Sequence, residues 1–330
     1  VLYSVAGHQQ RATHFLHAAE RGDHDGPPPD GTVSIESSLA IMRGSIAFDG
    51  VDATLADGLL ARELEPEDSA WRQLATFIVA LGHIWRGELE AAEPAIEFVM
   101  ANEVANEAIS VYARAELALI QLSRGDLLAA SASAESACVL ATETGLDTIF
   151  VTGLAHGAAA AASIALGDHP AANQHLDAAN QSMANIATAM PLDAMHTRIV
   201  LADAAIKLGR LSEARGYIDD ASRTSRRYRD CGVMTAQVDS LATQLQEAAQ
   251  CAPVELSDRE LAVLELLPSE LSIQGIADTL FVSKETVKTH RRHIYKKLDV
   301  SSRDDAVVTA RRMGLLIERA TADAGSAPSD

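Results

Sequence analysis

Residues 206–218, IKLGRLSEARGYI, decide the fold of the larger part of this chain. Gly209 is preceded three residues earlier by an isoleucine, and Ala214 and Ile218 follow it at five and nine residues. Glycine tolerates the left-handed conformation in which helices commonly end, and a small alanine lets a second helix approach the first closely. The stretch therefore predicts the turn of a helical hairpin.

The same phrase occurs three more times upstream, as IWRGELEAAEPAI at 84–96, LSRGDLLAASASA at 122–134 and IALGDHPAANQHL at 164–176. A weaker copy surrounds Gly50, and the successive glycines stand 37, 38, 42 and 42 residues apart. These intervals exceed the 34 residues of a tetratricopeptide repeat. We interpret the region as lengthened hairpins in a tetratricopeptide-like superhelix with a concave groove. The alternative is an irregular bundle in which alanine and glycine coincide through composition.

The composition favours an all-α fold. Of the 330 residues, 48% are hydrophobic but only 4% are aromatic, so alanine and leucine dominate, which suits closely packed helices. This length allows two or three domains. The chain has no apolar run of about 18 residues and no signal peptide, so we expect a cytoplasmic protein without a membrane partner. It begins with valine, as an excised piece of a longer protein would.

Candidate metal ligands are scattered along the sequence. Cys138, Cys231 and Cys251 are far apart and form no C-x-x-C pair, and His14 and His17 lack a third ligand at suitable spacing. We therefore expect reduced thiols, no metal and no cofactor. A nucleophile, a base and an orienting group do not occur as a recognisable set, so we do not expect an enzyme.

Helix-breaking glycine and proline residues mark the expected boundaries between domains. We expect a helical-repeat sensory or interaction domain at 1–250, a DNA-binding domain at 254–320 and a disordered tail at 321–330. A loop of breakers, GDHDGPPPDG at 22–31, precedes the repeats, and Pro253 marks the boundary. Between the last repeat and Pro253 we predict one more helix, from the apolar positions Val233, Val238, Leu241 and Leu245. We expect the basic segment SRTSRRYRD at 222–230 to be solvated.

Positive charge gathers in one segment of a chain whose net charge is −19. FVSKETVKTHRRHIYKKL, residues 281–298, holds six lysines and arginines against one acid. Before it, Ser257 and Glu260 predict a capping box and a helix over 258–267, and Ser272 and Ser283 cap a short second and a longer third helix. A short helix, a tight turn and a basic helix are the helix-turn-helix arrangement.

Helical geometry sorts the third helix into two faces. At about 100° per residue, Val287, Ile294 and Leu298 share one stripe that should pack inward. The opposite face carries Glu285, Thr289, Arg292 and Lys296, flanked by Lys288. Lysine and arginine donate to guanine in the major groove, whereas the acidity of the remaining chain discourages indiscriminate adhesion. The alternative is a solvated basic helix. His290 lies beside the stripe, where we favour a structural role.

These residues resemble the C-terminal domain of the LuxR family of transcriptional regulators. The resemblance rests on LSDRE, the IA of GIADTL, VSKETVKTH, HIYKKLDV and SSRDDAVVTA, which includes Arg303 and Ala306. It implies that residues 304–313 form a helix that pairs two domains on a two-fold DNA site. It also implies contacts to the bases from Lys288, Thr289 and Arg292, and to the backbone from Ser283, Lys284 and Thr286, to which we add Lys296.

Combined with the repeats, the chain resembles the C-terminal part of the large MalT-like regulators, in which a P-loop ATPase precedes the helical repeats. No G-x-x-x-x-G-K-[ST] occurs here, so ATP hydrolysis is not assigned to this chain. It departs from the LuxR pattern at Glu270, where a small residue is usual, and at Ile273 and Gly275, where asparagine and glutamate are usual.

We therefore expect a DNA-binding transcription regulator. Its expected partners are double-stranded DNA, a second copy of the chain on DNA, a small-molecule or protein effector in the repeat groove, and RNA polymerase as a further candidate. Trp71 and Trp85 are candidates for a ligand platform, although core packing is the favoured role for both. The alternative is a repeat scaffold whose C-terminal helices have lost DNA binding. A phosphorylated response regulator fits less well, because residues 1–250 lack alternating strand and helix patterns.

Overall fold

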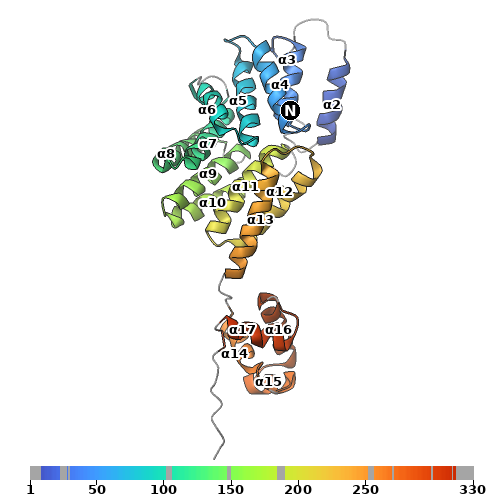
Figure 1. Ribbon diagram of the computed structural model, residues 1–330, viewed down its shortest axis with the longest axis vertical. Helices are drawn as coiled ribbons and strands as arrows, with labels where there is room; N and C mark the ends of the chain where they lie inside the picture. Colours follow the sequence, from blue (N-terminus) through green and yellow to red (C-terminus); the bar gives the residue numbers. More distant parts are fainter. Residues whose placement is uncertain are drawn as a thin grey trace, which may run out of the picture. The chain divides into compact units, whose positions relative to one another are not determined.

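A computed structural model describes residues 9–22, 28, 30–101, 106–146, 150–183, 190–251, 256–269, 271–298, 300–313 and 315–316. Within these ranges the chain forms sixteen α-helices and no strand, which confirms the predicted all-α class (Figure 1). The chain divides into two compact units, Val1–Gln250 and Cys251–Asp330. In the described residues no helix combines the length and apolarity that a membrane crossing requires.

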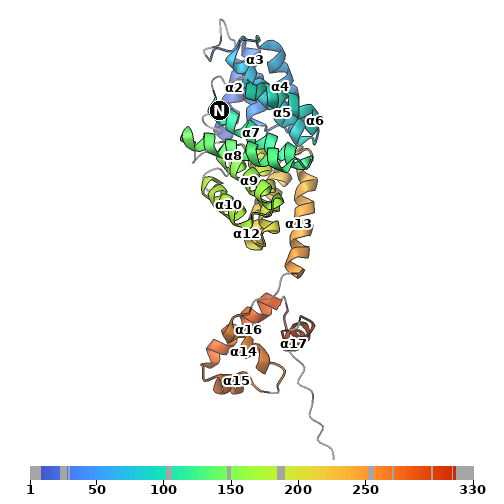
Figure 2. The same cartoon turned by 90° about the vertical axis from the view of Figure 1, so that its left-hand side faces the viewer.

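The first unit is a stack of helical hairpins between a first helix, α2 (Gln9–Arg21), and a last helix, α13 (Met234–Cys251). Successive hairpins lie side by side, as both views of the ribbon show (Figures 1 and 2). The hairpins pair α3 (Ile35–Ile46) with α4 (Val51–Leu64), α5 (Ala70–Trp85) with α6 (Leu89–Ala101), α7 (Glu107–Ser123) with α8 (Leu127–Glu143), α9 (Phe150–Ala165) with α10 (His169–Met183), and α11 (Pro191–Lys207) with α12 (Leu211–Arg227).

The repeat glycines stand between the two helices of their hairpins, as predicted. All four have positive φ, between +72° and +84°, in the left-handed region that favours glycine: Gly87, Gly125, Gly167 and Gly209. The alanines five residues later are wholly buried: Ala92, Ala130, Ala172 and Ala214. These positions confirm the superhelix of helical repeats. The weaker copy differs, because Ala47 takes the left-handed position after α3 and Gly50 begins α4.

The segment between α12 and α13 folds back onto the first hairpins. The amide of Val233 donates to the carbonyl of Trp85 at 2.8 Å, and the amide of Asp52 donates to Oδ2 of Asp230 at 2.8 Å. A Cβ at position 232 would lie 2.0 Å from the carbonyl oxygen of Trp85, so only glycine permits this approach. The hairpin stack therefore closes toward its own beginning. The predicted last helix is confirmed as α13, with Val238, Leu241 and Leu245 buried.

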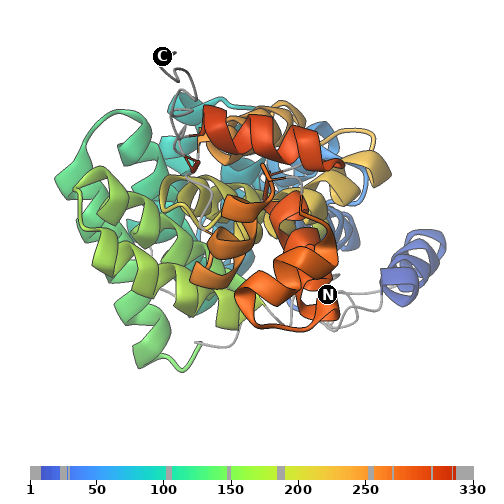
Figure 3. The ribbon, with the colours of Figure 1, turned by 90° about the horizontal axis from the view of Figure 1, so that it is seen from below.

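The second unit holds α14 (Asp258–Leu266), α15 (Ile273–Leu280), α16 (Lys284–Leu298) and α17 (Arg303–Arg312), drawn in orange to red in Figure 3. It has its own apolar core, to which all four helices contribute. Its helices begin where the sequence indicated. Ser257 and Glu260 form the capping box, Ser272 accepts from the amide of Gly275 at 3.1 Å, and Ser283 accepts from the amide of Thr286 at 3.1 Å.

Some predictions fall on residues outside the described ranges. These are the tail at 321–330, the boundary residue Pro253, most of the loop at 22–31, and Glu270. The other two departures from the LuxR pattern are described: Ile273 begins α15, and the Gly275 amide is the one that Ser272 caps. The basic segment at 222–230 contains the end of α12, which stops at Arg227, and its four arginines are exposed as expected.

Candidate functional site

The packing stripe of α16 lies where helical geometry predicted it. Val287 and Ile294 are fully buried and Leu298 is 4% exposed, all within the apolar core of the second unit. This burial fixes the rotation of α16 about its axis. The opposite face, with Thr289 and Arg292, is consequently exposed to solvent. His290 is half-buried beside the stripe, in keeping with the structural role favoured for it.

The three side chains expected near DNA bases differ in their present contacts. Nζ of Lys288 lies 2.7 Å from Oε1 of Glu285, one turn earlier on the helix. The hydroxyl of Thr289 donates to the carbonyl oxygen of Glu285 at 3.0 Å, which leaves its methyl group outward. Arg292 forms no hydrogen bond or ion pair with another described residue. Its guanidinium is therefore available for a bidentate contact without prior release.

The residues expected near the DNA backbone surround the first turn of α16. The hydroxyl oxygens of Ser283 and Thr286 lie 2.7 Å apart, and Lys284 is exposed beside them. A helix N-terminus attracts anions through its amides and dipole, so this end of α16 suits a phosphate. Lys296 is exposed near the other end of the helix. The four residues thus lie at two separate places along α16.

Sequence reasoning missed that Lys297, although exposed, anchors α16 to α14. Its Nζ lies 2.7 Å from Oε2 of Glu260, which is 4% exposed and also accepts from the amide of Ser257 at 2.8 Å. Burial acts to raise the pKa of Glu260, but the hydrogen bonds from Lys297 and Ser257 outweigh it and lower the pKa to about 2. The capping box was legible in the sequence, whereas its link to α16 was not.

Arg303 is a second residue whose role the sequence did not disclose. Its guanidinium donates to three backbone carbonyls, those of Leu267 at 2.8 Å, Leu271 at 2.9 Å and Ser269 at 2.7 Å. The last carbonyls of a helix have no partner within the helix. Arg303 therefore ties the end of α14 and the following turn to α17, and so holds the first two helices of the domain in register.

The turn before α16 carries an unusual residue. Phe281 ends α15 in the left-handed conformation, with φ of 54°, and its side chain is 96% exposed. Left-handed backbone is uncommon for a residue that carries a Cβ. The exposed ring lies three residues before the first residue of α16, Lys284.

Comparisons with known proteins agree with this geometry. Residues 254–310 match the profile of a family described as bacterial regulatory proteins, luxR family. The chain is 38% identical to the probable transcriptional regulatory protein NarL of Mycobacterium tuberculosis over 147 residues, which cover 40% of this chain and 68% of that protein. The chain belongs to the LuxR family of bacterial regulatory proteins. It is a LuxR-type transcription regulator, and its second unit is the LuxR-type head.

Other relatives share shorter stretches with this LuxR-family chain. It is 44% identical over 78 residues to the HTH-type transcriptional regulator MalT of Yersinia enterocolitica, covering 23% of this chain and 8% of that protein. It is 43% identical over 61 residues to the uncharacterized response regulatory protein YgeK of Escherichia coli, covering 42% of that protein. The chain thus spans less than a tenth of the MalT regulator and less than half of YgeK.

The repeat unit of this LuxR-type regulator contains a partly open cavity of about 500 Å³. It is lined by α3, α5 and α7 and by the beginnings of α9 and α11, which are the first helices of the five hairpins. Most of its lining is aliphatic or aromatic. Trp71 and Trp85 both border it, so the two candidates for a ligand platform meet at one space, although Trp85 is also part of the core. Its volume is that of a site for a small molecule.

Three buried polar atoms at this cavity have no hydrogen-bond partner among the described residues: Oγ of Ser45, Nε1 of Trp85 and Oδ2 of Asp193. Buried polar groups are nearly always satisfied, by protein, water or ligand. The other oxygen of Asp193 accepts from the hydroxyl of Tyr112 at 3.0 Å. Burial raises the pKa of Asp193 to about 7, so both the neutral and the charged forms of its carboxyl group are populated near pH 7.

A second pair lies one turn further along the same two helices. Nε2 of His196 on α11 is 3.1 Å from Oε1 of Glu116 on α7. Burial acts to lower the pKa of His196, but the charges of Glu116 and Asp193 outweigh it and raise the pKa. Tyr112 and Asp193 border the cavity, and Glu116 and His196 continue the same polar seam between α7 and α11 beyond its lining. The seam joins residues about 80 positions apart, and sequence patterns carry no signal of it.

Candidate metal ligands that are scattered along the sequence come together in the fold. Cys138, His156 and His175, separated by 18 and 19 residues, come together from α8, α9 and α10. No ligand spacing is visible along the chain because these residues belong to three different helices. A usable signal was the stacking of the hairpins, which places equivalent faces of successive helices against one another.

Proposed function

We propose that this LuxR-type regulator reads DNA with α16 in the major groove, using Lys288, Thr289 and Arg292 at the base edges. The observation that carries the proposal is the exposed, unpaired guanidinium of Arg292 on the face opposite the packing stripe. Arginine binds O6 and N7 of guanine in a bidentate manner, and the methyl group of a threonine suits the methyl group of thymine. The head thereby supplies sequence preference.

The phosphate contacts in this proposal come from Ser283, Lys284, Thr286 and Lys296. The first three surround the positive end of the α16 dipole, so one phosphate is bound there by amides, a hydroxyl and an ammonium group. Lys296 reaches the backbone near the other end of the helix. Contacts at both ends of α16 fix the helix in the groove, and the bases between them are then presented to Arg292.

Lys288 exchanges one partner for another in this scheme. Its ion pair with Glu285 is exposed and screened by solvent, so its release opposes binding only weakly. The carboxylate of Glu285 then faces the same groove and can accept a hydrogen bond from N4 of cytosine. The pair thus provides a donor and an acceptor side by side on the reading face.

We propose further that α17 pairs two heads on a two-fold site. Val308 on α17 is 65% exposed and Met313, the C-cap of the helix, is 40% exposed, so the C-terminal half of α17 presents apolar area to solvent. Two-fold pairing would cover the same patch on both copies. Val308→Lys should abolish cooperative binding to a duplex with two half-sites while leaving affinity for a single half-site unchanged. Equal cooperativity in the variant would reject α17 as the pairing helix.

For the repeat unit we propose that a small-molecule signal binds in the partly open cavity. The ligand class follows from the lining: an apolar body that carries an amine to meet Asp193 and an acceptor to meet Nε1 of Trp85. An amine binds the charged carboxylate, and the pKa of Asp193 is about 7. Such ligands should therefore stabilise the protein against heat more strongly at pH 8 than at pH 6. The cavity favours a small molecule over a protein as the effector.

Two variants test the cavity. Asp193→Asn keeps the shape of the side chain and should remove the preference for aliphatic and aromatic amines over matched alcohols. Ala108→Leu places bulk at the cavity wall without removing a polar group and should weaken both kinds of ligand. If amines raise the melting temperature of the Asp193→Asn variant as much as that of the parent protein, the carboxylate is not their partner.

The test of the whole function is the recovery of genomic fragments bound to the full chain, with the Arg292→Ala variant treated in parallel. We expect the parent protein to enrich fragments that share a short motif, and the variant to lose that enrichment. Fragments recovered without any shared motif, or none recovered at all, would favour the alternative of a repeat scaffold whose head no longer reads DNA.

A further inference from the structure

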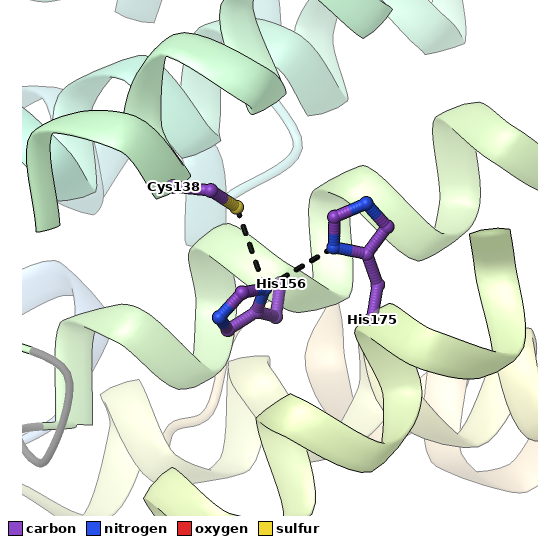
Figure 4. A group of neighbouring side chains, drawn as sticks. All are labelled: Cys138, His156 and His175. Carbon is purple, nitrogen blue, oxygen red and sulfur yellow. Dashed lines mark hydrogen bonds between the residues drawn. The ribbon is translucent and has the colours of Figure 1, made fainter. Parts of the chain in front are cut away.

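Three side chains with soft or borderline donor atoms converge within the repeat unit. Sγ of Cys138 and Nδ1 of His175 each approach Nδ1 of His156, at 3.4 Å and 3.2 Å respectively. All three donor atoms lie within 4.8 Å of one another. Figure 4 shows the thiol and the two rings pointing toward a common centre from three consecutive helices.

Hydrogen bonding alone does not satisfy this arrangement. Nδ1 of an imidazole carries either one proton or one lone pair in the ring plane, so it makes one strong hydrogen bond in either state. Here Nδ1 of His156 lies within hydrogen-bond distance of two other atoms that could each bind a metal, the Cys138 sulfur and the His175 nitrogen. A cation between the three atoms would use one lone pair from each.

Two of the three distances match those of a tetrahedral metal site. With Zn–S of about 2.3 Å and Zn–N of about 2.05 Å, tetrahedral angles place sulfur about 3.6 Å from nitrogen and the two nitrogens about 3.3 Å apart. The observed separations of 3.4 Å and 3.2 Å are close to these values, and the third pair of atoms lies within 4.8 Å. Thiolate and imidazole are the ligands that select zinc and related transition metals over magnesium and calcium.

The surroundings suit a bound cation. The charges of Glu135 and Asp168 act on the ring of His175. These two acids also contribute negative potential at the cluster. Cys138 is buried, whereas both histidines are half-buried, which leaves a side open for entry and for a water as fourth ligand.

We propose that Cys138, His156 and His175 bind one thiophilic divalent transition-metal ion, with Zn²⁺ as the reference metal. The thiol proton passes to solvent when the metal–sulfur bond forms, so one proton is released for each ion bound. The ion joins α8 to both helices of the next hairpin, α9 and α10. It therefore restrains two successive repeats, at a place separate from the DNA-reading face and from the lining of the cavity.

The test uses Co²⁺ and Zn²⁺ with the full chain. Co²⁺ should bind with one-to-one stoichiometry and produce a thiolate-to-cobalt charge-transfer band that Zn²⁺ removes. A variant with Cys231→Ser and Cys251→Ser, in which Cys138 is the only cysteine, should keep the whole band. Cys138→Ser should abolish it, and His175→Asn should weaken binding at least about tenfold, since even outer-shell changes cost that much.

Thermal unfolding gives a second readout. Zn²⁺ at about a hundredfold excess over Kd should raise the melting temperature of the parent protein by about 5 to 10 °C. It should leave the melting temperature of the Cys138→Ser variant unchanged. Absence of the band in the single-cysteine variant overturns the proposal even if Cys138→Ser proves too unstable to measure. A band that persists in Cys138→Ser would place the metal at another thiol and would overturn it equally.

Discussion

Arg292→Ala separates the reading of bases from adhesion to phosphate. The side chain is exposed and makes no contact with another described residue that the folded head requires, so the free energy of unfolding should change by less than about 0.5 kcal/mol. On the cognate duplex, the loss of a bidentate contact to guanine should cost about 1 to 3 kcal/mol. This corresponds to an increase in Kd of about 5- to 150-fold.

Lys284→Ala is the matched control, because it removes the same charge from an exposed site on the same helix. It should weaken binding to cognate and scrambled duplexes alike and reduce the salt slope by about one unit. Fluorescence anisotropy titrations of the full chain, on both duplexes and at several salt concentrations, measure these quantities. If Arg292→Ala lowers affinity for the two duplexes by the same factor, α16 adheres to phosphate and our assignment of base reading is wrong.

Three further predictions concern stability. The pKa of Glu260 is lower in the folded head than the ordinary glutamate value near 4.5, so the charged carboxylate stabilises the head at pH values above 4.5. This contribution should be lost as the pH falls from about 5 toward 2. Because Lys297 is 42% exposed and solvent screens the pair, Glu260→Gln should cost about 1 kcal/mol at pH 7 and flatten acid unfolding followed by circular dichroism. A Cβ at position 125 would meet no atom within 4 Å, but φ there is +84°, so backbone strain in Gly125→Ala should destabilise the repeat unit by about 1 kcal/mol. Gly216 is exposed within α12, so Gly216→Ala should stabilise the repeat unit by about 0.5 to 1 kcal/mol. Denaturant titrations measure both changes. Phe281→Gly should raise the melting temperature of the head, since it relieves left-handed strain at a side chain that packs on almost nothing; a lower melting temperature would contradict this reasoning.

The sequence by itself determined the hairpins and the helix-turn-helix. A left-handed glycine such as Gly125, a capping serine such as Ser257 and a packing position such as Val287 act over three or four neighbouring residues. Features that depend only on such close neighbours can be predicted from the local sequence alone. They placed each repeat glycine between two helices and turned the basic face of α16 outward before any contact between helices was known.

Only the tertiary structure decided which side chains meet across helices. The anchoring of Lys297 by Glu260 spans 37 residues, and the bond from Tyr112 to Asp193 spans 81. Such pairings depend on the rotation and offset of helices that pack ridge into groove, which no local pattern specifies. Burial then sets the chemistry, because a carboxyl group removed from water, like that of Asp193, holds its proton to a higher pH than the same group on the surface.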